Sequence, residues 1–279
     1  MKDNKLDFPK FSVLMSLYIK EKPEYFDECM KSILANTVLP SEIIIVLDGP
    51  ISDELKNVLN GYIEENPKLY KIVPLETNQG LGLALKEGIV NCSNEIIARM
   101  DTDDICVKDR FERQLLEFMD NENLDICGSH ILEFEDNINN IIARRMVPID
   151  HDAIMEYQKR RDSFNHMTVM YKKSAVLKAG NYQSCPLMED SYLWVNMLKS
   201  GAITKNVDAF LVYARIGADM YQRRGGLAYY KKYKKGRQII YKTGYISFWD
   251  YYYTIIIQLI VSLMPNKVRG FVFKKLLHK

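Results

Sequence analysis

The chain has 279 residues, of which 47% are hydrophobic and 27% charged, a composition that excludes a disordered or fibrous protein. Its five cysteines are an odd number without a C-x-x-C pair, which argues against a disulfide framework or a zinc site. The polar start MKDNKLDFPKF does not resemble a signal peptide, so we expect a reducing, cytoplasmic environment.

The net charge of +2 conceals two oppositely charged regions. Residues 221–279 contain thirteen Lys or Arg and a single acid, which gives +12, whereas residues 1–220 carry −10. We therefore expect an acidic domain over 1–220 and a basic, tyrosine-rich helical region over 221–279. This asymmetry indicates a partner or a surface for the C-terminal region.

Apolar runs of strand length alternate with stretches of helical spacing over the first hundred residues. The predicted strands are 11–18, 42–50, 70–76 and 94–100. The predicted helices between them are 24–36, 52–65 and 78–92. Strands that are apolar on every side are typical of parallel sheets covered by helices on both faces. The expectation is an α/β fold with a Rossmann-like, mostly parallel sheet flanked by helices.

Helical spacing continues further along the chain, with one more apolar strand. A strand is predicted over 124–135. Helices are predicted from Asp109 to about Met119 and over 150–160, 172–179 and 188–200.

The apolar segment 248–264 has 17 residues and includes Asp250 and Gln258. A helix that crosses a bilayer needs about 20 predominantly apolar residues, so crossing is not favoured. Basic and aromatic residues beside an apolar face suit a helix that lies on an anionic membrane surface. The alternative is a helical hairpin packed on the rest of the protein.

Carboxylates follow the predicted strand 94–100. Asp101 and Asp103 are two residues apart, so on an extended segment both side chains point to the same side. Such hard oxygen ligands suit Mg²⁺ or Mn²⁺. Alternatively, the acids of this segment pair with Arg99, Arg110 and Arg113 or cap the next helix.

Three further features have both a functional and a plain structural interpretation. Asp48 ends a strand and can accept hydrogen bonds from a base or ribose, or form an Asp-Gly turn. The glycine-bearing stretch 78–82 can cradle phosphate or simply begin a helix. Glu189 and Asp190 head an apolar helix, where the helix dipole favours acids, but one of them can also be a general base.

Basic residues near the end of the first domain allow phosphate contacts. Arg215, Arg223 and Arg224 lie close in sequence, and arginine forks match phosphate oxygens. The alternative is ordinary exposed charge. His166 is a lone histidine, for which a structural role is the simpler interpretation.

The order of these motifs resembles that of a family 2 glycosyltransferase of the GT-A type, over roughly residues 10–215. The motifs are a polar-aromatic turn after the first strand, V-L-D-G, N-Q-G-L-G-x-A-L, R-M-D-T-D-D and M-E-D-x-x-L-W. By this resemblance, Asp48 matches the acid that binds the nucleotide base, usually uracil. Asp101 and Asp103 match the D-x-D element, which commonly binds the Mn²⁺ or Mg²⁺ that bridges the donor diphosphate. Asp190 matches the catalytic base.

The resemblance also places Ser16 and Tyr18 at the first nucleotide-facing turn and Arg99 among the donor-binding residues. Two stretches depart from the family pattern: S-L-Y-I replaces P-x-Y-N, and V-L-D-G-P replaces V-D-D-G-S. These departures concern the base and ribose contacts. The remaining candidates for diphosphate or acceptor contacts are Glu189, His166, Arg223 and Arg224.

The resemblance implies inverting transfer of a sugar from a nucleotide-diphosphate donor, by expectation a UDP-sugar, to a hydroxyl of a glycan. It implies a polyprenyl-diphosphate-linked acceptor of bacterial capsule, O-antigen or exopolysaccharide synthesis, met at the inner face of the membrane. Residues 10–110 would bind the donor and residues 111–220 the acceptor.

Two alternatives remain at this stage. One is an inactive nucleotide-sugar-binding scaffold subunit that docks through its C-terminal region. The other is a sugar-nucleotide nucleotidyltransferase, whose first loop is normally rich in glycine and lysine, whereas FSVLMSLYIKEK has no glycine. No nucleic-acid-binding module is recognised, so no nucleic-acid partner is expected.

Overall fold

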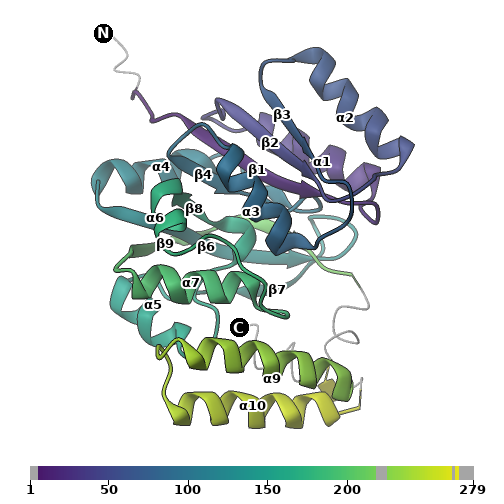
Figure 1. Ribbon diagram of the computed structural model, residues 1–279. Coiled ribbons are helices and arrows are strands. Elements are labelled where there is room, and N and C mark those ends of the chain that lie inside the picture. The colour runs from purple at the N-terminus through teal and green to yellow at the C-terminus, as the bar shows by residue number, and fades with distance from the viewer. Residues whose placement is uncertain (1–5, 218–224, 266–267, 270–279) are drawn as a thin grey trace.

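A curved sheet with helices on both faces organises the protein, and a helical hairpin packs at one end (Figure 1). The computed structural model describes residues 6–217, 225–265 and 268–269. Within these residues the sheet has nine strands, eight of them in the order β3-β2-β1-β4-β8-β6-β9-β5, while β7 pairs with β6. The predicted α/β class is therefore confirmed.

The first half of the sheet is parallel, as the apolar runs predicted. Its strands are β1 (Phe11–Leu17), β2 (Glu42–Leu47), β3 (Tyr70–Pro74) and β4 (Ile96–Arg99). The helices that connect them are α1 (Pro23–Leu34), α2 (Asp53–Glu65) and α3 (Leu81–Asn91). Side chains alternate across β1, so Val13 and Met15 pack towards α1 and α2 while Leu14 packs towards α3. Both faces of the strand are buried, which explains the continuous apolar run.

Beyond β4 the pairing is mixed, because β8 is antiparallel to both β4 and β6 whereas β9 runs parallel to β6. The strands are β5 (Ile105–Cys106), β6 (Leu124–Phe134), β7 (Ile141–Arg145), β8 (Met170–Lys172) and β9 (Ile203–Arg215). The helices are α4 (Arg110–Asp120), α5 (His151–Gln158), the 3-10 turn η1 (His166–Thr168), α6 (Lys173–Lys178) and α7 (Glu189–Lys199). Helix α4 covers the face of α1 and α2, while α6 and α7 join α3 on the other face.

Several elements differ from the sequence-based expectation, since β5, β7, β8 and β9 were not predicted and one predicted helix is split. Strand β9 was not predicted, because its register with β6 shifts at several points and its sequence therefore lacks a clean period of two. The helix predicted over 172–179 is split, since Lys172 ends β8 and α6 begins at Lys173.

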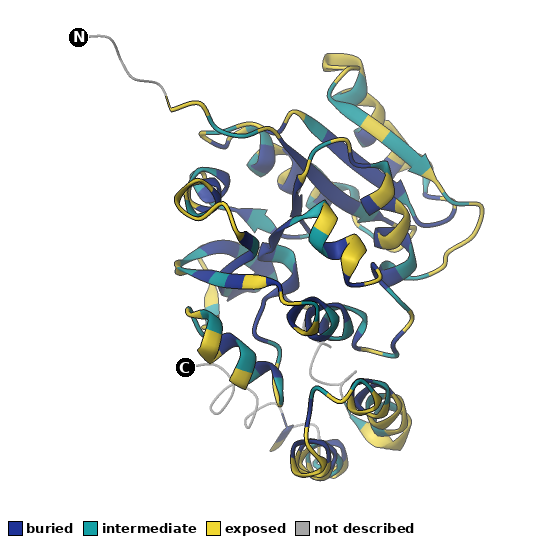
Figure 2. Ribbon diagram, turned by 60° about the vertical axis from the view of Figure 1, so that its left-hand side comes forward, coloured by how far each residue is buried: buried dark blue, intermediate teal, exposed yellow. Residues whose placement is uncertain are grey.

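The C-terminal region forms a hairpin of α9 (Gly226–Lys242) and α10 (Phe248–Leu263) that packs below α7 (Figure 1). A small apolar cluster joins the hairpin to α7, including Val195, Ile240 and Ile255. Figure 2 shows the burial concentrated in the sheet and exposed residues on the outer sides of the hairpin. Within the described residues, no helix has the length and apolar character that crossing a membrane requires. The domain boundary predicted near 220 falls in 218–224, outside the described residues.

The close packing of α3 on the sheet gives a stability prediction. A Cβ at Gly88 would lie 2.3 Å from Leu14 Cδ1 and 3.0 Å from Val46 Cγ2, in a part of the core that has no spare room. We expect Gly88→Ala to lower the free energy of unfolding by about 1–3 kcal/mol, as overpacking does. Urea denaturation followed by circular dichroism measures it.

Gly61 in α2 provides the matched control, because nothing lies within 4 Å of its added Cβ. Gly61→Ala should raise stability by about 0.5–1 kcal/mol through helix propensity alone. A Gly88→Ala variant that is as stable as Gly61→Ala would contradict the packing described here.

Candidate active site

The carboxyl ends of β1, β2 and β4 open into a cavity of about 880 Å³. Six residues singled out in the sequence line it, namely Ser16, Tyr18, Asp48, Asp101, Asp103 and Arg215, together with Asn78, Gly80 and Leu81 of the glycine-bearing stretch. Ligands of open α/β sheets bind at this edge because the strands end and the loops diverge there. We call this space the donor cavity, after the expectation from the motifs that the sugar donor binds here.

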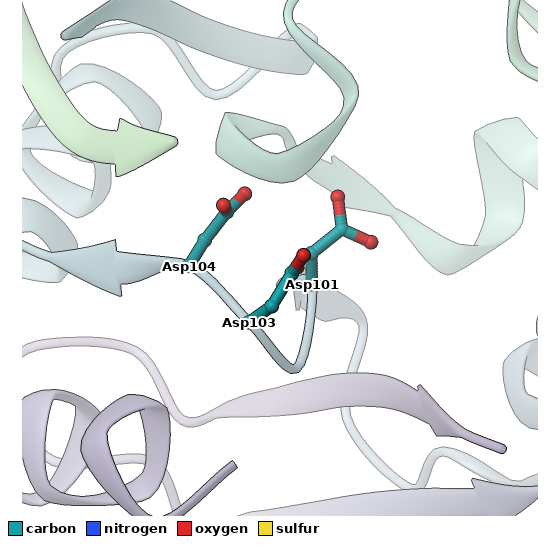
Figure 3. Close-up of side chains that lie close together, drawn as sticks. All are labelled: Asp101, Asp103 and Asp104. Atoms are coloured by element: carbon teal, nitrogen blue, oxygen red, sulfur yellow. The ribbon is translucent and has the colours of Figure 1, made fainter. Parts of the chain in front are cut away.

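Three aspartates from the loop between β4 and β5 lie close together (Figure 3), and two of them, Asp101 and Asp103, line the donor cavity. Carboxylate oxygens of Asp101, Asp103 and Asp104 lie within 4.8 Å of one another. Asp104 was one of the acids that the sequence assigned to the start of the next helix or to pairing with a nearby arginine. That expectation was wrong, since the Asp104 carboxylate is buried in the group and helix α4 begins only at Arg110. We call these residues the acidic trio.

Burial and mutual repulsion make the ionised forms of Asp103 and Asp104 unfavourable. Burial, together with the neighbouring Asp101 carboxylate, raises the pKa of Asp103 to about 7. Burial and the other two carboxylates also raise the pKa of Asp104. In addition, Asp104 Oδ2 is buried and accepts no hydrogen bond from any described residue. Oxygen-only donors with these properties fit a divalent cation such as Mg²⁺ or Mn²⁺.

The arginines near the trio have different partners. Arg99 is buried and donates to both carboxylate oxygens of Asp101, with Nη1 2.6 Å from Oδ2. Arg113 pairs with Asp109 at 2.6 Å on the surface, as local pairing predicted. Arg110 instead donates to the Arg99 carbonyl oxygen at 2.7 Å and forms no ion pair with the described residues. The carboxylates of the trio are thus only partly neutralised by arginine.

Arg215, at the end of β9, fastens the acidic loop from the opposite half of the sheet. Its backbone N–H donates to Asp104 Oδ1 at 2.8 Å, and its Nε donates to the Asp103 carbonyl oxygen at 3.0 Å. The guanidinium also pairs with Glu28 and lies 3.9 Å from the centre of the Tyr25 ring. From the sequence, Arg215 was expected only as part of a basic cluster, because β9 and its contact with the loop were not predicted.

Asp48 is buried beneath the start of α3. Its Oδ1 accepts the Gln79 backbone N–H at 2.6 Å and its Oδ2 accepts the Gly80 N–H at 3.0 Å. The carboxylate therefore fixes the glycine-bearing turn against the end of β2 while it also borders the donor cavity. Gly82 continues this close packing, because a Cβ there would lie 2.9 Å from Glu189 Cβ. The start of α3 thus touches the start of α7.

Asp190 lies in the first turn of α7 and lines a second cavity of about 390 Å³. Burial, with Asp162 as the strongest neighbouring charge, raises its pKa to about 7. A carboxylate with this pKa can take up a proton near neutral pH, which is what a general base requires. We call this space the second cavity.

His166 lies behind Asp190 and lines neither cavity. Its Nδ1 is 4.0 Å from Asp190 Oδ2, and its Nε2 is 2.7 Å from the Tyr182 hydroxyl. Burial and the nearby Arg99 hold the pKa of His166 well below its usual value, so the ring is neutral. His166 is therefore a buried, neutral neighbour of Asp190, and its hydrogen bond goes to Tyr182. Arg223 and Arg224 lie outside the described residues.

This arrangement agrees with what comparison with known proteins shows. The model of glycosyl transferase family 2 matches residues 12–179. The chain belongs to glycosyl transferase family 2. The resemblance in the motifs is therefore confirmed, and glycosyl transfer is the activity shared by this family and its curated bacterial relatives.

Two curated relatives match this family 2 glycosyltransferase over nearly its full length. The UDP-Gal:alpha-D-GlcNAc-diphosphoundecaprenol beta-1,3-galactosyltransferase of Escherichia coli is 37% identical over 274 residues, which are 98% of this chain and 98% of its own length. The amylovoran biosynthesis glycosyltransferase AmsE of Erwinia amylovora is 36% identical over 268 residues, or 95% of this chain and 98% of its own.

Among solved structures, the mannosyltransferase PcManGT from Pyrobaculum calidifontis, in complex with GDP-Man and Mn²⁺, has a TM-score of 0.64 at 13% identity. The match covers 85% of this chain and 65% of that chain. It confirms the predicted GT-A fold.

The position of Arg215 gives a prediction for this glycosyltransferase. Arg215→Met removes charged hydrogen bonds from a nearly buried guanidinium and should lower stability by about 2 kcal/mol or more. Arg113→Met removes an exposed pair and should change stability by about 0.5 kcal/mol or less. Denaturant titrations of both variants measure the difference. Equal effects would contradict the role of Arg215 as the fastening of the acidic loop.

Proposed function

We propose that this chain is a metal-dependent, inverting glycosyltransferase that moves a sugar from a UDP-sugar to a hydroxyl of a lipid-linked glycan. The observation that carries the proposal is the position of two carboxylates, one at each cavity. Asp103 borders the donor cavity and Asp190 lines the second cavity. The buried Arg99 pairs with Asp101, and its charge also acts on Asp190.

Ser16, Tyr18 and Asp48 hold the nucleoside in this proposal. All three line the donor cavity at the ends of β1 and β2. Each Asp48 oxygen accepts one backbone N–H and keeps a second lone pair for a base or ribose donor. A uridine donor is supported by the E. coli relative, which is named for UDP-Gal.

Asp101 and Asp103 hold the divalent cation, and Asp104 adds a third carboxylate that was not among the ligands expected from the sequence. The Mn²⁺ in the PcManGT complex with GDP-Man supports this assignment. When bound, the cation supplies positive charge to the departing nucleoside diphosphate. Arg99 donates to both oxygens of the Asp101 carboxylate and so fixes its orientation at the cavity.

Asp190 accepts the proton of the acceptor hydroxyl. The hydroxyl oxygen forms a bond to the anomeric carbon as the bond between that carbon and the diphosphate oxygen breaks. The electron pair leaves with the nucleoside diphosphate. A single displacement of this kind inverts the anomeric configuration and forms no covalent enzyme intermediate.

The acceptor in this proposal is a polyprenyl-diphosphate-linked sugar of bacterial surface polysaccharide synthesis. Support comes from the E. coli relative, named for alpha-D-GlcNAc-diphosphoundecaprenol, and from the relative of amylovoran biosynthesis. Such an acceptor resides in a membrane, so the hairpin would bind the inner membrane face peripherally.

The outer face of α10 supports this location. Large apolar side chains are exposed at helical spacing along it, and we call them the α10 stripe. They are Phe248, Trp249, Tyr252, Tyr253, Ile256, Ile257, Ile260 and Leu263. The neighbouring helix α9 exposes five lysines. They are Lys231, Lys232, Lys234, Lys235 and Lys242. An apolar face beside exposed lysines matches an anionic lipid surface, where each lysine contributes about 1 kcal/mol.

Donor binding is tested first by thermal unfolding with UDP, GDP, dTDP and their sugars, with and without Mn²⁺. A ligand that binds only the folded state adds about 2.7 kcal/mol of stability at a hundredfold excess over its Kd. We expect a Mn²⁺-dependent rise in melting temperature with uridine nucleotides that is absent in Asp103→Asn.

Asp109→Asn is the matched control, because Asp109 lies in the same acidic segment but pairs with Arg113 on the surface. It should respond like the wild type. No shift with any nucleotide would contradict the donor proposal. Donor binding without transfer or hydrolysis would favour the inactive scaffold instead.

The proton-accepting role is tested by the pH dependence of transfer. Since the pKa of Asp190 is about 7, the carboxyl is protonated below that pH and cannot act as a base, so kcat/KM should fall as the pH drops through 7. Asp190→Asn should lower kcat by about 10²–10⁴-fold.

Asp162→Asn provides the control for this assignment, because the Asp162 charge raises the pKa of Asp190. Its removal should move the midpoint of the pH profile to lower pH while the activity at high pH persists. A fully active Asp190→Asn variant would exclude Asp190 as the base.

A further inference from the structure

The second cavity lies between the catalytic domain and the hairpin, and its lining combines a base with several arginines. Arg145 comes from the end of β7, while Arg160 and Arg161 follow α5. Asp190 of α7 faces the same space. None of these arginines was a candidate from the sequence, because they are far from the recognised motifs.

Four arginines line the second cavity. Arg237 is buried and donates to Thr254 and to the Lys159 carbonyl oxygen, and two of the other three have no ion-pair partner among the described residues. Arg145 and Arg161 form no ion pair with the described residues, and Arg161 contacts only the face of the Tyr157 ring, at 5.8 Å. Arg160 differs, since its Nε donates to the buried Asp250 at 2.6 Å. Arginine forks at a cavity wall match phosphate oxygens bidentately.

Acids also line the second cavity, namely Glu133 and Asp162 besides Asp190. A mixed lining is what a sugar 1-diphosphate needs, because one ring carries both the anionic diphosphate and the hydroxyl that must lose a proton. The arginines can bind the diphosphate, and Asp190 can accept the proton of the hydroxyl. A cavity that binds only a neutral sugar would not need arginines that lack an ion-pair partner.

The second cavity also adjoins the α10 stripe. The Arg160 guanidinium lies 5.1 Å from the centre of the Tyr253 ring, and Tyr253 belongs to the stripe. Gln258, from the same helix, lines the cavity itself. An amphiphile can therefore lay its hydrocarbon tail along the stripe while its charged head enters the cavity.

We propose that Arg145 and Arg161, beside the Asp250-held Arg160, bind the diphosphate of the lipid-linked acceptor. This inference rests on the proposed function and assigns the acceptor's diphosphate to specific residues. The tail then follows the α10 stripe into the membrane, and the sugar extends towards Asp190.

Binding of farnesyl diphosphate to the full-length chain tests the inference, by calorimetry in EDTA without a donor. Each of Arg145→Gln and Arg161→Gln should weaken binding about tenfold, the loss expected for a charged hydrogen-bonding partner. Arg144→Gln is the matched control, because Arg144 is the neighbour of Arg145 on β7 but lies over Phe210 and outside the cavity. Arg160 is left intact since its removal would leave the buried Asp250 unpaired.

Two further titrations test which part of farnesyl diphosphate is bound and in which cavity it binds. Inorganic pyrophosphate should bind more weakly than farnesyl diphosphate, and equal affinity would overturn the lipid part of the inference. Excess UDP should not displace farnesyl diphosphate, whereas displacement would place it in the donor cavity and overturn the assignment. Unchanged affinity in both arginine variants, or an equal loss in Arg144→Gln, would likewise overturn it.

Transfer assays separate this inference from the proposed function. In Arg161→Gln, KM for a lipid-diphosphate-linked GlcNAc should rise about tenfold while KM for the donor stays unchanged. Transfer with wild-type kinetics in both arginine variants would overturn the inference and leave the function standing. Farnesyl diphosphate binding that depends on the arginines, without transfer to any acceptor, would support the site and contradict the function.

Discussion

The structure depends on negative charge being held in a partly buried position at the ends of the parallel strands. Three carboxylates within 4.8 Å repel one another, and burial raises the free energy of their charged forms. Two arginines from different parts of the chain stabilise this arrangement of carboxylates. Arg99 neutralises Asp101 from within the sheet, and Arg215 fastens the loop from β9. The remaining deficit of positive charge is what a bound divalent cation can supply.

Arg215 also explains why the second half of the sheet matters for a site built mainly from the first half. Asp103 and Arg215 are 112 positions apart, and β9 reaches the loop only because it runs the length of β6. The start of α3 meets the start of α7 in a similar way, through the missing side chain of Gly82. The two cavities are thus held in fixed relation by a few contacts between distant segments, which suits transfer from one bound molecule to another.

The sequence predicted the parallel half of the fold well because its strands are short, apolar on both faces and separated by regular helices. The same regularity predicted that Asp48 and Asp101 lie at one edge of the sheet. What it missed depends on long-range pairing: β9, with its shifted register, and the contact of Arg215 with the acidic loop. Asp104 was misplaced because its burial follows from that contact and not from local spacing.

In the C-terminal hairpin, the apolar segment of α10 forms part of two surfaces, one packed against the rest of the protein and one exposed. Tyr251 and Ile255 of α10 pack inward, while the stripe on the opposite side stays exposed. The acid within this segment, Asp250, forms a capping box with Ser247 and pairs with Arg160. Asp250 therefore starts the helix and at the same time fixes an arginine at the edge of the second cavity. The folding of the hairpin and the shape of the second cavity are thereby coupled, because a helix that began elsewhere would leave Arg160 without its partner.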